Sequence, residues 1–208
     1  MCIRAVFSLA DRDYVTVERC VAKLLPITEE YNLKLWFSLA LMIKEFLAAR
    51  NGDSSSFQRF ASADELLTAT KFKMFMPILR IEFSRSLLAL GLTGEAADLA
   101  DKAHEMIMQT SERWPLSDLH RLQASLAKAD NNLEAVEEHL HAALDVARHQ
   151  GAKMWELRAA IDLASLWRDA GRTEDAIALL QPIYDCIDEG DCPEDRAIAQ
   201  TMIVAFTS

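Results

Sequence analysis

The chain has few of the residues that interrupt helices, since its 208 residues include only 6 glycines and 5 prolines. It is also short of positive charge: 22 lysines and arginines face 32 aspartates and glutamates, which gives a formal net charge of −10. Non-specific nucleic-acid binding requires Lys and Arg to neutralise phosphates, and anionic membrane surfaces attract the same residues. The composition therefore argues against direct binding to nucleic acid or to a membrane.

Cysteines are few and form no CxxC pair; the four are Cys2, Cys20, Cys186 and Cys192. Reduced thiols are the expected state, because this spacing is typical neither of a disulfide framework nor of a metal site. No apolar run reaches the roughly 18–20 residues of a transmembrane helix. The stretch Met1–Ala10 has one arginine and a short apolar segment, but no convincing signal-peptide cleavage region. We read it as a helix and predict a cytoplasmic location.

Short polar or glycine-bearing breaks recur along the chain at a nearly fixed interval. Taking Asp11, Asn51, Gly91, Asp130 and Gly171 as anchors, the steps are 40, 40, 39 and 41 residues. The sequence between these anchors has the pattern of helices almost throughout. A fixed period of this size is typical of stacked helix pairs, in which each pair buries its apolar face against the next.

The prediction is an all-α, right-handed α-solenoid of about five antiparallel helix pairs, closed by a terminal helix that covers the open end. The expected pairs are Cys2–Ala10 with Tyr14–Glu30, Leu33–Arg50 with Ser55–Ala69, Phe72–Leu90 with Glu95–Thr110, Leu116–Ala129 with Leu133–Gln150, and Met154–Asp169 with Thr173–Ile187; the last helix is Glu194–Phe206. We expect Pro77 to kink or restart its helix. These pairs define one repeat domain, 1–208, with repeats at 1–31, 32–70, 71–112, 113–151 and 152–190 and a cap at 191–208.

Small or apolar residues recur along one stripe of the second helix in the last three pairs, where they would let neighbouring helices approach closely. They are Ala96, Ala100 and Ala103; Ala135, His139 and Ala142; and Ala176, Leu180 and Ile183. This spacing favours a tetratricopeptide-like repeat. The period of about 40 residues fits HEAT-type pairs better than a 34-residue unit, so the HEAT-like alternative stays open.

The stretches that follow the fourth pair are the most specific: AKMWELRAA (Ala152–Ala160), LASLWR (Leu163–Arg168), Gly171–Arg172 and AIALLQPIY (Ala176–Tyr184). They resemble the C-terminal tetratricopeptide-like region of large bacterial signalling proteins, in which an adenylate cyclase or a winged-helix domain precedes an NTPase module. The resemblance is strongest over Gly91–Gly190. It implies an interaction or sensory region and no catalytic residues, because the cyclase and NTPase parts have no counterpart here. It is equally consistent with a fragment of such a protein and with a stand-alone relative.

Motifs that would carry chemistry are weak. Gly91-x-x-Gly94 lacks the length and the lysine of a phosphate-binding loop and is interpreted as a turn. His139 and His141 lie two apart on a helix and therefore point in nearly opposite directions, which argues against a shared metal ion. A carboxylate cluster near the C-terminal end lacks the ligand order of an EF-hand and is interpreted as a solvated face; it comprises Asp185, Asp188, Glu189, Asp191, Glu194 and Asp195. We predict no catalytic residue, no metal and no cofactor.

The predicted function is a non-catalytic protein–protein interaction or regulatory module that captures a protein or peptide in the concave groove. Projecting the first helix of each pair back from its turn places Arg85, His120, Lys128, Ser165 and Arg168 near the inner face. A basic groove of this kind would suit an acidic helix or a peptide carboxylate. The alternative is that these residues are ordinary surface charges whose stems pack along apolar neighbours.

Two further hypotheses concern apolar residues. Val6, Phe7 and Leu9 on the short first helix would expose apolar surface and support a homodimer through one end of the solenoid. A competing function is a small-molecule sensor, with a ligand among aromatic residues of the second and third pairs. Core packing is the other explanation for those residues, which are Trp36, Phe37, Phe46, Phe57, Phe60, Phe72, Phe75 and Phe83. The four tryptophans are interpreted as core or inter-repeat wedges, or as contact points for a partner.

Overall fold

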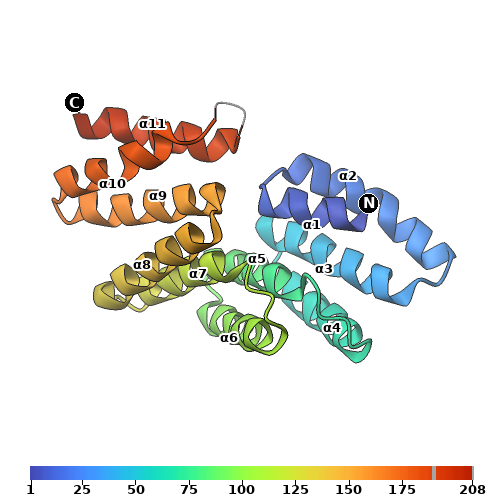
Figure 1. The fold of residues 1–208 in the computed structure, drawn as a ribbon. Helices are drawn as coiled ribbons and strands as arrows, with labels where there is room; N and C mark the ends of the chain where they lie inside the picture. Colours follow the sequence, from blue (N-terminus) through green and yellow to red (C-terminus); the bar gives the residue numbers. More distant parts are fainter. Residues whose placement is uncertain (189–190, 208) are drawn as a thin grey trace. The chain divides into compact units, whose positions relative to one another are not determined.

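A computed structural model describes residues 1–188 and 191–207, and this part of the chain consists of eleven α-helices without a strand (Figure 1). The helices are α1 (Cys2–Ala10), α2 (Tyr14–Glu30), α3 (Lys34–Arg50), α4 (Ser56–Ala69), α5 (Met76–Ala89), α6 (Thr93–Thr110), α7 (Leu116–Ala129), α8 (Leu133–Gln150), α9 (Lys153–Asp169), α10 (Thr173–Asp185) and α11 (Pro193–Thr207). The all-α prediction is confirmed, and most helix ends fall within two residues of the expected ones. Glu189 of the acidic cluster and Gly190, the end of the last expected repeat, lie outside the described residues.

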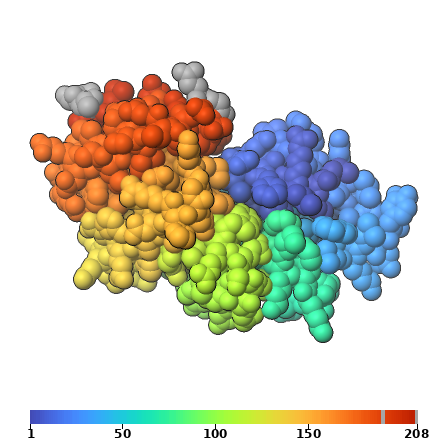
Figure 2. All heavy atoms as spheres, viewed as in Figure 1, coloured from blue at the N-terminus to red at the C-terminus, as the bar shows by residue number. Residues whose placement is uncertain are grey.

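The chain forms two compact units, Met1–Glu112 and Arg113–Ser208. The first contains α1 to α6 and the second α7 to α11. Their boundary coincides with the end of the third expected repeat. Within each unit, side chains fill the space that the ribbon leaves between neighbouring helices (Figure 2). None of the helices in the described part of the chain is long and apolar enough to cross a bilayer.

The turns inside the helix pairs share one backbone motif. Each has a residue in the left-handed conformation 39 or 40 residues after the previous one; these are Arg12, Gly52, Gly91, Asn131 and Gly171. The residue that follows donates its N–H to the carbonyl five positions earlier, at N···O distances of 2.7 to 3.0 Å. This is the Schellman arrangement, which satisfies carbonyls left open at a helix end. The predicted turn period is therefore a period of helix C-caps.

The start of α5 corrects one predicted boundary. A helix was expected from Phe72, with Pro77 as a kink or a restart, and the structure begins the helix at Met76. Phe75 adopts φ +65°, which interrupts any helix that would run through it. Pro77 has no N–H to bond a carbonyl one turn earlier, so it costs least in the first turn of a helix, where that N–H has no partner. Residues 72–75 are not helical, so α5 is neither kinked nor restarted at Pro77 but begins one residue before it.

The buried stripe of α8 corrects another prediction. The expected stripes are buried in α6 and α10, but in α8 Ala135, His139 and Ala142 are only half-buried. The next residues along the chain, Val136 and Leu140, are 3% exposed instead. Burying larger aliphatic groups removes more apolar surface from water than burying alanines. The helix is therefore rotated about its own axis by one residue relative to the prediction.

The short first helix also differs from expectation. Val6 and Leu9 are fully buried in the first unit, whereas Phe7 is 52% exposed. Phe7 packs edge-on against Phe75, with 6.1 Å between ring centroids. Only one of the three residues expected to expose an apolar end therefore does so, although Ile3, one turn earlier on the same face, is exposed as well.

Candidate functional site

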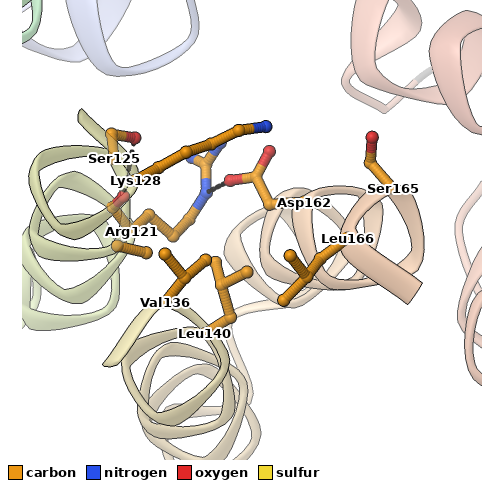
Figure 3. Close-up of a pocket in the computed structure, with 9 residues that line it drawn as sticks. Arg121, Ser125, Lys128, Val136, Leu140, Asp162, Ser165 and Leu166 are labelled. Atoms are coloured by element: carbon orange, nitrogen blue, oxygen red, sulfur yellow. Dashed lines mark hydrogen bonds and ion pairs between the residues drawn. The ribbon is translucent and has the colours of Figure 1, made fainter. Parts of the chain in front are cut away.

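A pocket of about 150 Å³ lies between α7, α8 and α9 in the second unit (Figure 3). Its lining comprises Arg121, Ala124, Ser125 and Lys128 of α7, Val136 and Leu140 of α8, and Asp162, Ser165 and Leu166 of α9. The spacings of three and four residues place each helix's contribution on one face of that helix. A volume of this size accepts one benzene-sized group rather than a drug-sized ligand.

The floor of the pocket is apolar. Val136 and Leu140 are buried on the α8 side, and Leu166 of α9 lies beside them (Figure 3). Ala124 is also buried, and its small side chain leaves the space that the pocket occupies. A hydrocarbon group placed on this floor would leave water at a gain of about 25 cal/mol per Å² of apolar area.

Arg121 joins α7 to α9 along one wall. Its Nε lies 2.7 Å from Asp162 Oδ2, and its Nη1 lies 2.7 Å from Asp118 Oδ1. Burial works against the charged guanidinium, but attraction to Asp162 and Asp118 outweighs it, so the pKa of Arg121 lies above its ordinary value. Arg121 is therefore a permanent cation shared by two carboxylates, and it fixes the orientation of Asp162.

The polar groups of the pocket lie on the side opposite α8. In Figure 3 the Lys128 ammonium reaches over the Arg121 guanidinium, and the second oxygen of Asp162 points away from Arg121 toward the same open side. Lys128 is exposed, and none of the ion pairs among the described residues involves it. Ser165 presents its hydroxyl on the α9 side, and Ser125 donates its own to the Arg121 carbonyl at 3.0 Å. The pocket thus combines an apolar floor with a cation and a carboxylate at its mouth.

Two of the five predicted binding residues meet in this pocket, Lys128 and Ser165. His120 lies outside its lining, with Nδ1 3.0 Å from Gln123 Oε1. Arg168 is exposed and pairs with the neighbouring Asp169 at 2.7 Å. Arg85 belongs to the first unit, where its Nε lies 3.6 Å from Glu82 Oε1. The pocket itself carries both signs of charge, with Arg121 and Lys128 on α7 and Asp162 on α9.

Sequence reasoning missed Arg121, Ser125 and Asp162. Ser125 precedes Lys128 by three residues, and Asp162 precedes Ser165 by three, so each shares a helix face with a predicted residue. Extending the predicted positions by one helical turn would have found both.

The other candidate chemistry resolves into packing and ion pairs. His139 faces His120 with ring centroids 6.2 Å apart, whereas His141 lies beside Trp167. In residues 1–188 and 191–207 there is no group of three or more His, Cys, Asp or Glu that could hold a metal ion. Within the acidic cluster, Asp195 is buried and pairs with Arg158 at 2.6 Å, so it is not a solvated residue.

The tryptophans of the second unit act as wedges between helices. Trp114 stacks on Trp155 with 5.6 Å between ring centroids. Trp167 donates its indole N–H to Glu137 at 2.6 Å, and Arg172 lies 2.9 Å from the same carboxylate. The hydrogen bond from Trp167, followed by the contact with Arg172, lowers the pKa of Glu137 below its ordinary value. In the first unit, Trp36 is 37% exposed and meets Phe72 edge-on.

A second, larger cavity of about 400 Å³ lies between α8, α9 and α10. Pro182, Ile183 and Ile187 supply its apolar lining. Charged side chains border it: Arg148 pairs with Glu156 at 2.9 Å, and the Lys153 ammonium donates to the Cys186 carbonyl at 3.0 Å.

Comparison of the sequence with protein-family models finds none that matches, and comparison with curated proteins finds no significant match.

Proposed function

We propose that the chain is a non-catalytic protein–protein interaction module with a right-handed, tetratricopeptide-like solenoid architecture. It would act as part or relative of a bacterial signalling protein of the cyclase or NTPase-regulator type, in the cytoplasm. Its contact site would be the pocket between α7 and α9, where a segment of a partner protein inserts one side chain. Asp162 is held by Arg121 in an ion pair, an arrangement suited to recognition rather than to proton transfer.

The order of helix packing supports the solenoid part of the proposal. Within the first unit α1 packs on α3 and α3 packs on α5, and within the second unit α7 packs on α9 and α9 packs on the last helix, α11. In addition, α8 packs against both α7 and α9. Stacked helix pairs produce this pattern, and in proteins of that kind the first helices of the pairs form a surface used for binding.

The observation that carries the binding proposal is the composition of the α7–α9 pocket. An apolar floor below a few oriented polar groups is the usual construction of a recognition site. The size of the pocket suits a single side chain. The first helices α7 and α9 supply all of its charged groups, as expected for the binding face of a helical repeat.

Affinity capture with charge-matched variants tests this proposal. We would compare proteins retained by wild-type chain, by Lys128→Glu and Ser165→Trp at the pocket, and by Lys23→Glu, an exposed lysine of α2. The proposal predicts a protein that wild type and Lys23→Glu retain equally and that both pocket variants lose. A partner retained equally by all four proteins would contradict the assignment of the site.

The larger cavity favours a second candidate function, small-molecule sensing. Its volume of about 400 Å³ lies in the range of ligand sites. The aromatic residues of the second and third pairs supply less support, because Phe60 and Phe83 stack at 3.8 Å in the core of the first unit. Native mass spectrometry of the purified chain tests the sensor function: a bound metabolite lost on Ile183→Trp substitution would favour it.

A further inference from the structure

The α7–α9 pocket has a layered chemistry that specifies its occupant more closely than its size alone. In Figure 3 the apolar side chains Val136 and Leu140 of α8 and Leu166 of α9 lie below the charged groups. The Lys128 ammonium and the second oxygen of Asp162 lie on the opposite, open side. A side chain that enters between α7 and α9 therefore meets apolar groups at its far end, and one positive and one negative charge where it joins its main chain.

The apolar floor excludes polar side chains from the pocket, and the charges at its mouth favour a contact with the main chain of the partner. A charged or amide side chain inserted to the floor would leave its polar end against hydrocarbon, where unpaired polar groups are costly. At the mouth, Asp162 can only accept hydrogen bonds, whereas Lys128 can only donate them. One residue of a peptide offers the complementary pair, an N–H donor and a C=O acceptor on either side of its side chain.

The main-chain contact also selects the backbone conformation of the partner. Inside an α-helix the N–H and C=O groups bond to each other and are not available to Asp162 and Lys128. In an extended segment they remain open, and alternate side chains point the same way. The pocket therefore suits an extended segment, with one side chain inserted and the next directed outward.

We propose, on the basis of the protein-binding function proposed above, that the pocket binds one aliphatic residue of an extended partner segment. This residue is a valine, leucine, isoleucine or methionine. Its side chain packs on Val136, Leu140 and Leu166. Its N–H donates to Asp162, and its C=O accepts from Lys128, with the Ser165 hydroxyl beside them. Arg121 does not touch the segment and acts as a positioning residue, because it holds Asp162 in place through Oδ2.

A displayed library of random 12-residue peptides, selected on the full chain, provides the probe. Clones that Ser165→Trp fails to bind are synthesised, and their anchor is identified by alanine substitution. The inference predicts an aliphatic anchor whose truncation weakens binding about tenfold or more. N-methylation of the anchor N–H should cost about tenfold, and Lys128→Met should weaken the same peptides.

Variants that change the size of the pocket floor test whether the floor selects the anchor side chain. Leu166→Ala enlarges the pocket and should shift the preferred anchor toward phenylalanine, whereas Leu166→Phe should favour alanine or abolish binding. Circular dichroism checks that these variants fold. Because Leu166 is only half-buried, both should remain helical.

The outcomes separate this inference from the function on which it rests. Peptides that bind at the pocket through a charged or amide anchor, or that tolerate N-methylation, would overturn the inference and leave peptide binding intact. The absence of any peptide sensitive to Ser165→Trp would overturn the proposed function as well. A titration with free leucine and with its acetyl, methylamide-blocked form adds a third test: binding of free leucine alone would assign the pocket to a metabolite.

Discussion

The buried ion pair between Arg158 and Asp195 predicts a large, non-additive effect of mutation. It joins α9 to α11 at an N–O distance of 2.6 Å, and the two side chains are 2% and 3% exposed. Asp195 lies in the first turn of α11, where a negative charge also interacts favourably with the helix dipole. We consider Arg158→Met, Asp195→Val and the double variant, because these replacements are apolar and together change the buried volume little.

Each single variant should be strongly destabilised, since it leaves one buried charge without its main partner. Removing one member of a buried pair costs about 3–5 kcal/mol. Replacing both members by apolar groups is often neutral or stabilising, because the desolvation cost of both ions disappears. The double variant should therefore recover most of the loss, with a coupling free energy of several kcal/mol between the two sites.

Urea unfolding followed by tryptophan fluorescence measures these values, since Trp114, Trp155 and Trp167 all lie in the second unit. With a slope of about 2 kcal/mol per M, a loss of about 4 kcal/mol lowers the midpoint by about 2 M. The double variant should return to within about 0.5 M of wild type. Additive losses in the double variant would refute the reasoning, because they would mean that the two charges act independently.

Three further predictions concern a turn, a carboxylate and the thiols. Gly91 has φ +79°, so Gly91→Ala should destabilise the protein by about 1 kcal/mol in thermal melts. Gly94 lies in open space within a helix, so Gly94→Ala should stabilise the protein slightly. Equal effects of the two substitutions would be inconsistent with the left-handed turn at Gly91. Glu137 has a lowered pKa in the fold, so its contribution to stability is present at neutral pH and is lost as the pH falls below about 4.5. The melting temperatures of wild type and Glu137→Gln should thus differ at pH 7, and the difference should shrink as the pH falls below about 4.5; a difference independent of pH would contradict this assignment. A thiol reagent should modify exposed Cys186 within the native protein and buried Cys20 only after unfolding, as mass spectrometry of the digested protein would reveal.

Helix positions could be predicted closely from the sequence because the local signals are strong. Polar or glycine-bearing turns end the helices through left-handed caps, and glycine and asparagine tolerate that conformation at four of these caps, Gly52, Gly91, Asn131 and Gly171. Phe75 is an exception, since a phenylalanine with positive φ has no local signal. It is the proline two residues later that determines where α5 starts.

The candidate site was predictable only in part, because it depends on which face each helix turns inward. A shift of one residue in α8 exchanged Ala135 for Val136 at the packing surface, and Val136 now forms part of the pocket floor. The pairing of Arg121 with Asp162 joins residues 41 positions apart, and no periodicity of a single helix indicates it. Long-range ion pairs of this kind depend on how neighbouring helices pack and are therefore accessible only from the structure.

The central claim is that the chain meets its partner at the pocket between α7 and α9. The most direct test is two-dimensional NMR of isotopically labelled chain, titrated with the protein retained by affinity capture or with a selected peptide. We predict that the shifts concentrate in residues 121–128, 136–140 and 162–166, and that Ser165→Trp abolishes them. Shifts confined to α10, to the α1–α3 surface or to the larger cavity, with these three segments unchanged, would contradict the account.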